Sequence, residues 1–215
     1  MKHITGCDIK AMEQRTRARL INSLSGFKSA NLIATQDKKG CSNLAIVSSV
    51  FHLGANPPLL GMIIRPAGVP RNTLSNIEQT GSYTINHVSS SIYRQAHQTS
   101  ARYDADVSEF EAVGLTEKYI DGILAPFVEQ SRLKFALQVR QITELSINDT
   151  VLVIGEVEHI ITEQNSIKTD GYLDIESIAS VAVSGLDSYH QTQRLARLSY
   201  AKPQQELSSL PIDGS

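Results

Sequence analysis

The stretch that most constrains how this chain can fold runs from Asn43 to Arg71, where Asn56-Pro57-Pro58 separates two apolar runs. Proline cannot donate to a β-ladder and restricts the residue before it, so this break ends the first strand. The second run, Leu59–Ile64, predicts a short buried strand. A hairpin at Lys38-Lys39-Gly40 precedes both strands, because glycine tolerates the positive φ that such a turn usually needs.

Two adjacent hydroxyl residues, Ser48 and Ser49, follow the β-branched start of the first strand. Successive side chains of a strand alternate between its faces, so we expect one hydroxyl on each face. A buried hydroxyl without a partner costs roughly 1–3 kcal/mol, so a pocket-facing serine needs a backbone carbonyl or the polar edge of a ligand. The edge of a flat heterocycle, rich in C=O and N–H groups, would satisfy that need.

A helix is predicted directly after Arg71, with Asn72 as N-cap and Gly81 as the residue after its end. The unpaired N–H groups and the dipole at a helix N-terminus attract anions. Arg71 would add a bidentate clamp for a phosphate group, and Thr73 a further hydroxyl donor. The alternative is an ordinary capped helix with a solvated arginine. Only the strand that precedes the helix favours the anion site over this alternative.

Four segments together resemble the flavin reductase-like, FMN-binding split-barrel proteins, and within them the flavoredoxin-like branch. The matching segments are NLAIVSSVFHLGANPPLLGMIIRP, RNTLSNIEQTGSYTINHV, AHQTSARYDADVSEFEAVGL and SGLDSYHQTQRLARLSYAKP. The resemblance spans residues 25–203 and implies a mainly β fold, an antiparallel Greek-key barrel with peripheral α-helices. It also implies a homodimer with each FMN site near the subunit interface. We expect residues 1–24 to form a helical arm and residues 204–215 a flexible tail.

The resemblance also assigns site residues. Along the isoalloxazine ring it places Asn43, Ser48, Ser49 and Val50. At the FMN phosphate it places Arg71, Asn72 and Thr73. Near the flavin it places Asn86 and His87, which end a strand predicted over residues 83–88. A similar C-terminal segment packs near the flavin in that family, so Tyr189 is a candidate for the same region, with a structural aromatic as the alternative.

A second group of candidates lies on a short helix predicted over residues 92–100. Arg94 and His97, together with Arg102 just beyond it, would form a cationic lip over the pocket that could bind a nucleotide. A solvated helix face explains the same residues equally well.

The remaining periodicity predicts a charged amphipathic helix over residues 9–24 and a first strand over residues 29–36. Two longer alternating segments, residues 133–142 and 150–161, flank turn residues and predict an antiparallel pair. Such a pair would close a barrel and remove its exposed edges.

Composition excludes several function classes. The chain of 215 residues has a net charge of −2, which gives no electrostatic footprint for nucleic acid. It has no apolar run near the ~20 residues of a membrane helix and no signal-peptide core, so we expect a cytoplasmic protein. Cys7 and Cys41 are expected to be free thiols, and the histidines show no ligand spacing, so no metal is expected. The GxSxG, GxGxxG and Walker patterns are absent as well.

The expected function is that of an NAD(P)H-dependent flavin reductase, in which hydride passes from the nicotinamide to FMN. The cofactor carries this chemistry, so no catalytic side chain is nominated. One alternative is a flavoredoxin-like electron carrier that takes electrons from a protein partner. Another is a non-enzymatic binding module for flavin or haem. The sequence does not distinguish NADH from NADPH.

Overall fold

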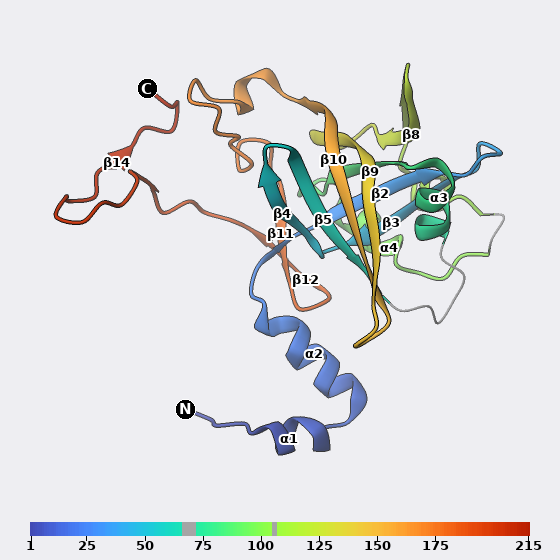
Figure 1. Ribbon diagram of the computed structural model, residues 1–215, viewed down its shortest axis with the longest axis horizontal. Coiled ribbons are helices and arrows are strands. Elements are labelled where there is room, and N and C mark those ends of the chain that lie inside the picture. The colour runs from blue at the N-terminus through green and yellow to red at the C-terminus, as the bar shows by residue number, and fades with distance from the viewer. Residues whose placement is uncertain (66–71, 105–106) are drawn as a thin grey trace.

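The computed structural model describes residues 1–65, 72–104 and 107–215 (Figure 1). Within these residues the largest sheet has seven antiparallel strands in the order β3-β2-β6-β9-β10-β5-β4. Smaller sheets are formed by β1-β11-β12, by β7-β8 and by β13-β14. The mainly β architecture with peripheral helices confirms the predicted fold class.

The strands follow the predicted pattern closely, with Pro58 opening β5 and Gly40 in the β2–β3 hairpin at φ 89°. Their bounds are β1 Lys28–Ser29, β2 Asn31–Gln36, β3 Ser42–Val47, β4 Val50–Ala55, β5 Pro58–Ile64, β6 Ser82–His87, β7 Glu117–Ile120, β8 Ile123–Val128, β9 Leu133–Leu145, β10 Thr150–Thr162, β11 Val181–Ser184, β12 Ser188–Gln191, β13 Arg197–Leu198 and β14 Ser209–Leu210.

The barrel closes at the corner between β3 and β4. These strands are the two edges of the seven-stranded sheet, yet only Ser48 and Ser49 separate them in sequence. The Ser49 hydroxyl donates to the carbonyl of Ile63 on β5 (2.7 Å), which fixes the corner. Two expectations were therefore wrong: the two serines lie outside any strand, and the β9–β10 pair lies inside the sheet rather than closing it.

The helices surround this barrel. The predicted helix over residues 9–24 is two helices, because Thr5 and Glu13 each accept a backbone N–H from the first turn that follows and start separate helices. The helical elements are α1 Gly6–Ala11, α2 Gln14–Leu24, α3 Asn72–Thr80, α4 Tyr93–Gln98, α5 Glu109–Val113 and the 3₁₀ helix η1 Gln164–Ser166. None of those described is long and apolar enough to cross a membrane.

Two hydrophobic cores flank the main sheet. One fills the barrel and receives Ile77 from α3, so that helix packs against the barrel through its apolar face. The other lies under α4, α5 and the β11–β12 hairpin, where Leu44 of β3 meets Phe110 of α5. Because side chains alternate along β3, Asn43 points to the opposite face from Leu44. This alternation aims Asn43 at α3.

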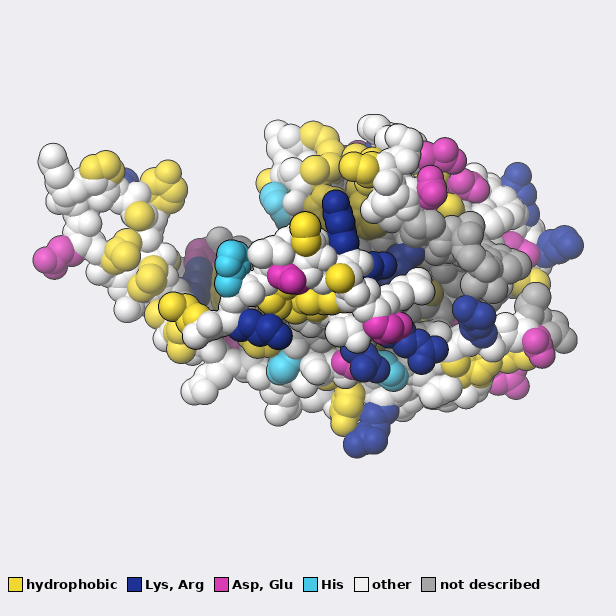
Figure 2. All heavy atoms as spheres, turned by 90° about the horizontal axis from the view of Figure 1, so that it is seen from below, with side chains coloured by type: hydrophobic (Ala, Val, Ile, Leu, Met, Phe, Trp, Pro, Cys, Tyr) yellow, Lys and Arg dark blue, Asp and Glu magenta, His cyan; other side chains and the backbone are white. Residues whose placement is uncertain are grey.

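Two segments project from the barrel, as Figure 1 shows. The N-terminal arm of α1 and α2 contains no buried residue. The C-terminal arm, residues 195–215, presents a group of exposed apolar side chains that Figure 2 shows at its left-hand end. Its large exposed apolar residues are Leu195, Leu198, Tyr200, Leu207, Leu210 and Ile212.

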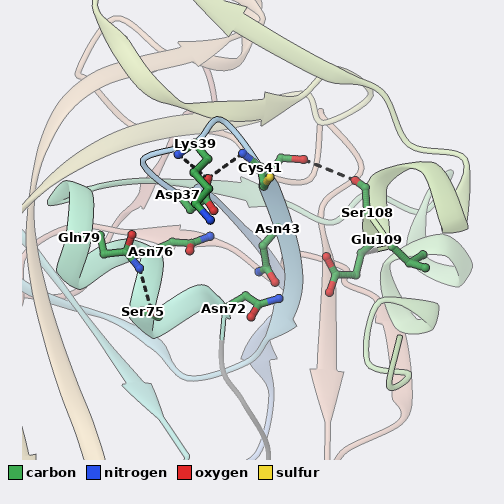
Figure 3. A pocket seen from close by; sticks show the side chains of 12 residues that line it. Asp37, Lys39, Cys41, Asn43, Asn72, Ser75, Asn76, Gln79, Ser108 and Glu109 are labelled. Carbon is green, nitrogen blue, oxygen red and sulfur yellow. Dashed lines mark hydrogen bonds between the residues drawn. The ribbon is translucent and has the colours of Figure 1, made fainter. Parts of the chain in front are cut away.

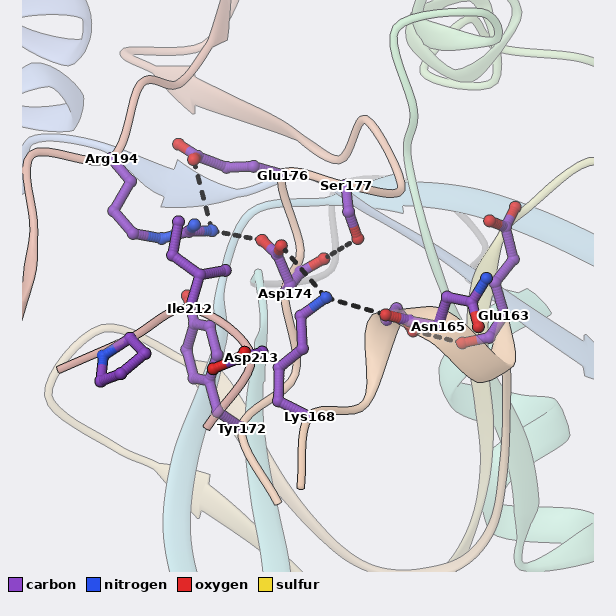
Figure 4. Close-up of polar contacts among 12 residues, drawn as sticks. Glu163, Asn165, Lys168, Tyr172, Asp174, Glu176, Ser177, Arg194, Ile212 and Asp213 are labelled. Atoms are coloured by element: carbon purple, nitrogen blue, oxygen red, sulfur yellow. Dashed lines mark hydrogen bonds and ion pairs between the residues drawn. The ribbon is translucent and has the colours of Figure 1, made fainter. Parts of the chain in front are cut away.

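A network of polar contacts ties the C-terminal arm to the loop after η1 (Figure 4). Arg194 pairs with Asp174, which is 6% exposed and also has Lys168 within 3.7 Å. The Tyr172 ring lies between two guanidinium groups, 5.6 Å from that of Arg194 and 4.1 Å from that of Arg197. Within residues 204–215, which we expect to form a flexible tail, β14 pairs with β13 and the carbonyl of Pro211 accepts from Arg197.

Removal of the Asp174 charge should release the C-terminal arm. Burial, the largest single influence, would raise the pKa of this carboxyl, but the hydrogen bond and charge of Arg194, the Ser177 N–H and the Lys168 charge together lower it, so the group is ionised at neutral pH. A hydrogen bond to a charged group is worth about 1.5–3 kcal/mol, so Asp174→Asn should raise the rate of tryptic cleavage in residues 194–202 about tenfold. Glu144→Gln, at an exposed carboxylate of β9, is the control. Equal cleavage rates in both variants would contradict the role given to Asp174.

Candidate functional site

A cleft of about 460 Å³ opens where the start of α3 faces the β2–β3 hairpin and α5 (Figure 3). Its volume lies in the roughly 300–1,000 Å³ range of small-molecule sites. Amide and hydroxyl side chains dominate its wall. We call it the α3 cleft, and its lining residues are Asp37, Lys39, Cys41, Ser42, Asn43, Asn72, Ser75, Asn76, Gln79, Val107, Ser108 and Glu109.

Asn43 joins the strand to the helix at the edge of this cleft. Its side chain is only 5% exposed, and its Nδ2 donates to Oγ1 of Thr73 (2.8 Å). Thr73 is the acceptor in this bond, so the bond does not use its hydroxyl proton. Asn72, the first residue of α3, is exposed and lines the cleft directly. The structure therefore places Asn43, which the resemblance assigned to the isoalloxazine, beside Asn72 and Thr73.

At α3 the predicted residue after the helix, Gly81, is confirmed, whereas the predicted N-cap, Asn72, is wrong. Gly81 follows the helix at φ 69°, and its N–H donates to the carbonyl of Ile77 (2.8 Å). Asn72 is already helical, so it is not the residue that precedes the helix. Arg71, the predicted phosphate clamp, lies outside the described residues.

The carboxylates of the cleft wall are directed at backbone donors. Glu109 accepts the N–H of Leu44 (3.1 Å), and Asp37 accepts those of Cys41 and Lys39 (2.8 Å each). The hydrogen bond from Cys41 is the main reason why the pKa of Asp37 is lowered. These hydrogen bonds stabilise both carboxylates, and the Lys39 ammonium supplies positive charge to the lining.

This donor set fits a phosphate group. The backbone N–H groups at the start of the nine-residue helix α3, which have no acceptor within the helix, favour an anion, and Asn72, Thr73 and Lys39 add an amide, a hydroxyl and an ammonium donor. Of the residues that line the cleft, sequence reasoning named Asn43 and Asn72 as site residues and missed the others, among them Glu109 and Asn76. Asn76 could have been found, because it follows Asn72 by one helical turn and so shares its face.

The residues assigned to the isoalloxazine do not lie together. Asn43 stands near the start of β3, whereas Ser48, Ser49 and Val50 follow its end. Five residues of extended chain span about 16 Å, so Asn43 belongs with the helix terminus and not with this group. None of Ser48, Ser49 and Val50 lines the α3 cleft.

Asn86 is a structural residue. It is fully buried, its Nδ2 donates to the Leu32 carbonyl (3.2 Å) and to Thr84 Oγ1 (2.9 Å), and its Oδ1 accepts the N–H of Val128 (2.9 Å). These bonds engage both ends of the amide, so Asn86 has little capacity left for a ligand. The expectation that it serves the flavin is therefore not supported by its contacts.

His87, at the end of β6, lies among protein groups as well. Its Nδ1 is 3.2 Å from the Ser180 hydroxyl, and its ring contacts that of Phe135 edge-on, with centroids 6.1 Å apart. Burial lowers its pKa to about 4, so the ring is neutral at physiological pH.

Of the second group of candidates, predicted on and after the short helix, the structure brings His97 into contact with Tyr189. His97 Nδ1 lies 2.9 Å from the Tyr189 hydroxyl, which joins α4 to β12. The guanidinium of Arg94 lies over the Tyr93 ring, 5.4 Å from its centroid. Arg102 is exposed. None of these residues lines the described part of the α3 cleft, and His97, Tyr189, Tyr93 and Arg94 form a separate cluster.

The comparison with known domains decides the family, because a model of the flavin reductase-like domain matches residues 24–176. The chain belongs to the flavin reductase-like family. Its fold is similar to that of a split-barrel protein from Shewanella frigidimarina NCIMB 400 classed as a flavin reductase. That protein is 59% identical, with a TM-score of 0.91 and coverage of 94% of this chain and 100% of that one.

More distant members share the split-barrel fold. Nitrilotriacetate monooxygenase component B from Bacillus cereus is 19% identical, with a TM-score of 0.80 and coverage of 92% of this chain and 98% of that one. Flavoredoxin of Desulfovibrio vulgaris (Miyazaki F) is 20% identical, with a TM-score of 0.69 and coverage of 83% and 92%. The predicted split-barrel, flavin reductase-like assignment is confirmed.

The neutral state of His87 should make folding depend on pH. Its pKa falls from 6.5 to about 4 on folding, so between these values the unfolded state binds more protons and stability is lost as the pH drops. The shift corresponds to about 2 kcal/mol lost between pH 7 and pH 5. Urea unfolding at both pH values should show this loss in the wild type and in His159→Gln, an exposed control, but a smaller loss in His87→Gln. The same loss of stability in all three proteins would refute the assignment of this pH dependence to His87.

Proposed function

We propose that the protein is an FMN-binding flavoprotein that takes hydride from NAD(P)H. The observation that carries this proposal is the junction of Asn43 and Thr73 at the N-terminus of α3, where the donors of the α3 cleft converge. Membership of the flavin reductase-like family makes flavin the ligand with which this anion site is most consistent.

In this proposal the chain binds FMN along β3. Asn72, Thr73 and Arg71 hold the terminal phosphate at the α3 end, and Asn43 positions the Thr73 hydroxyl. Ser48, Ser49 and Val50 lie at the other end of β3, beside the ring system. A terminal phosphate held by a helix N-terminus favours FMN over FAD, whose phosphates lie within a longer molecule.

Bound flavin would supply the redox chemistry by accepting hydride from the nicotinamide. The chain then contributes binding, orientation and the exclusion of water, and no side chain has to act as acid or base. We also propose that the protein acts as a homodimer, because exposed apolar residues such as Phe27, Leu24 and Leu198 lie on the two projecting arms. A second copy would cover such surfaces.

The phosphate assignment predicts a difference between two threonines of the same helix. Thr73→Val removes the hydroxyl at the start of α3, and loss of a hydrogen bond to a charged group should weaken FMN binding about tenfold. Thr80→Val removes a hydroxyl at the other end, where Oγ1 donates to the Asn76 carbonyl (2.7 Å), and serves as the matched control. Quenching of flavin fluorescence measures both affinities. Equal affinities in the two variants would contradict the phosphate assignment.

The reductase activity is tested separately by anaerobic absorption spectra of the FMN-loaded protein. Bleaching of the flavin band by NADH or NADPH supports a reductase and identifies the donor. A flavin that only dithionite reduces would contradict the reductase and favour an electron carrier, a role consistent with the fold shared with flavoredoxin. A protein that cannot be loaded with flavin would overturn the whole proposal.

A further inference from the structure

The two edges of the seven-stranded sheet, β3 and β4, differ in what covers them (Figure 1). Side chains bond the β3 edge, where Glu109 accepts the N–H of Leu44 (3.1 Å) and Thr99 accepts that of Ile46 (3.0 Å). The helices α4 and α5 pack on β3, and α3 packs on β2 and β3. Within the part of the chain that the structure describes, only β5 bonds to the backbone of β4. The β4 edge is therefore open.

The backbone groups that face this open edge follow from the pairing of β4 with β5. The N–H of Ile63 donates to the Ser49 carbonyl (3.4 Å). In an antiparallel pair, residues that bond to the partner strand alternate with residues that do not. Phe51 therefore directs its backbone groups toward β5, whereas Val50 and His52 direct their N–H and C=O groups toward the free edge. Such a row of unpaired groups is a template for another strand.

The side chains on the outer face beside this edge are apolar. Phe51 is 40% exposed, and its ring lies over Gly61 of β5, where an added Cβ atom would clash with the ring. Ile154 of β10 lies opposite Gly61 on the other side, so it shares this face of the sheet. Phe51 and Ile154 belong to none of the described hydrophobic cores. The outer face is therefore an apolar surface that the described chain leaves partly exposed.

The stretch that forms this edge carries no charge. Residues 50–64, which include β4 and β5, contain no Asp, Glu, Lys or Arg. Proteins commonly protect an open edge with charged side chains, above all lysine. Near a two-fold axis each residue faces its own kind, so a charge there would meet a like charge. A neutral edge therefore suits contact with a second copy of this chain and offers no attraction to a charged partner.

We propose that β4 pairs antiparallel with β4 of a second copy of this chain, which joins the two main sheets into one. With the two-fold axis at Phe51, Val50 of each copy exchanges N–H···O=C bonds with His52 of the other. The two Phe51 side chains then lie directly opposite each other, with their Cα atoms about 4.5 Å apart. Cross-strand aromatic pairs of this kind stabilise a sheet. The irregularity of the β4–β5 ladder lies beyond these residues, between His52 and Gly54.

This pairing brings a residue of the second copy to the proposed flavin site. The proposed function places Ser48, Ser49 and Val50 beside the flavin ring, and the pairing places His52 of the second copy opposite Val50. The inference rests on the proposed function for this consequence and for the homodimer, whose interface it names. The pairing itself does not require flavin.

Two changes at His52 test the backbone bonds, with the dissociation constant of the dimer measured by sedimentation equilibrium of the full chain. His52→Pro removes the N–H at the free edge and leaves the β4–β5 ladder intact, because that N–H takes no part in it. Each dimer loses two hydrogen bonds, so its dissociation constant should rise about thirtyfold. His52→Ala keeps the N–H and is the matched control, which should dimerise like the wild type. Circular dichroism shows that each variant is folded.

A cross-link at the axis tests the register of the pairing. In a chain whose own cysteines are replaced by Cys7→Ser and Cys41→Ser, Phe51→Cys should form an intermolecular disulfide on mild oxidation. The expected Cα separation lies within the span of about 4.4–6.8 Å that disulfides bridge. Leu124→Cys, at an exposed position of β8, is the control and should remain uncross-linked. Equal cross-linking of the two variants would contradict the register.

Failure of this inference is distinguishable from failure of the proposed function, because FMN affinity is measured on the same samples. A monomeric wild type, or a dimer that His52→Pro leaves unchanged, would overturn the β4 interface without touching the flavin assignment. A dimer that depends on β4 in a protein that cannot bind FMN would support the interface and overturn the flavin assignment. A dimer that Leu198→Lys dissociates but His52→Pro does not would assign the interface to the C-terminal arm.

Discussion

The closure of the barrel at Ser48 and Ser49 is the constraint on which the rest of the structure depends. A seven-stranded sheet whose edge strands are β3 and β4 can be joined by two residues only if it curls until its edges meet. The bond from Ser49 Oγ to the Ile63 carbonyl supports that corner, and the side chains of Glu109 and Thr99 accept backbone N–H groups from the β3 edge. The barrel interior must accommodate the curvature, and Gly155 does so on β10, since a Cβ atom there would lie 2.3 Å from the Tyr83 hydroxyl.

Closure also positions the α3 cleft. With β3 fixed at its end, one face of the strand directs Asn43 toward Thr73 of α3, and the other face packs Leu44 and Ile46 under α4 and α5. The strand therefore connects the α3 cleft near its start with the barrel corner of Ser48 and Ser49 at its end.

The sequence predicted those features that depend on local chemistry. Pro58 marks the start of a strand, Gly40 a hairpin and Gly81 the end of a helix. These positions were predictable because the φ angles open to proline and glycine depend on the residue itself and not on its distant contacts. Prediction from the sequence failed where contacts between segments far apart in the chain determine the role of a residue. The partners of Asn86 come from β2, β6 and the end of β8, and no periodicity indicates that its amide is saturated. The resemblance grouped Asn43 with Ser48, but the geometry of β3 separates them.

The central claim is that the N-terminus of α3 holds the phosphate of a flavin whose ring lies toward the far end of β3. A crystal structure of the protein grown with FMN tests it most directly. The account predicts phosphate oxygens within hydrogen-bond distance of Thr73 Oγ1 and of the first N–H groups of α3, with the ring beside Ser48, Ser49 and Val50. Flavin bound with its phosphate away from α3 would contradict it.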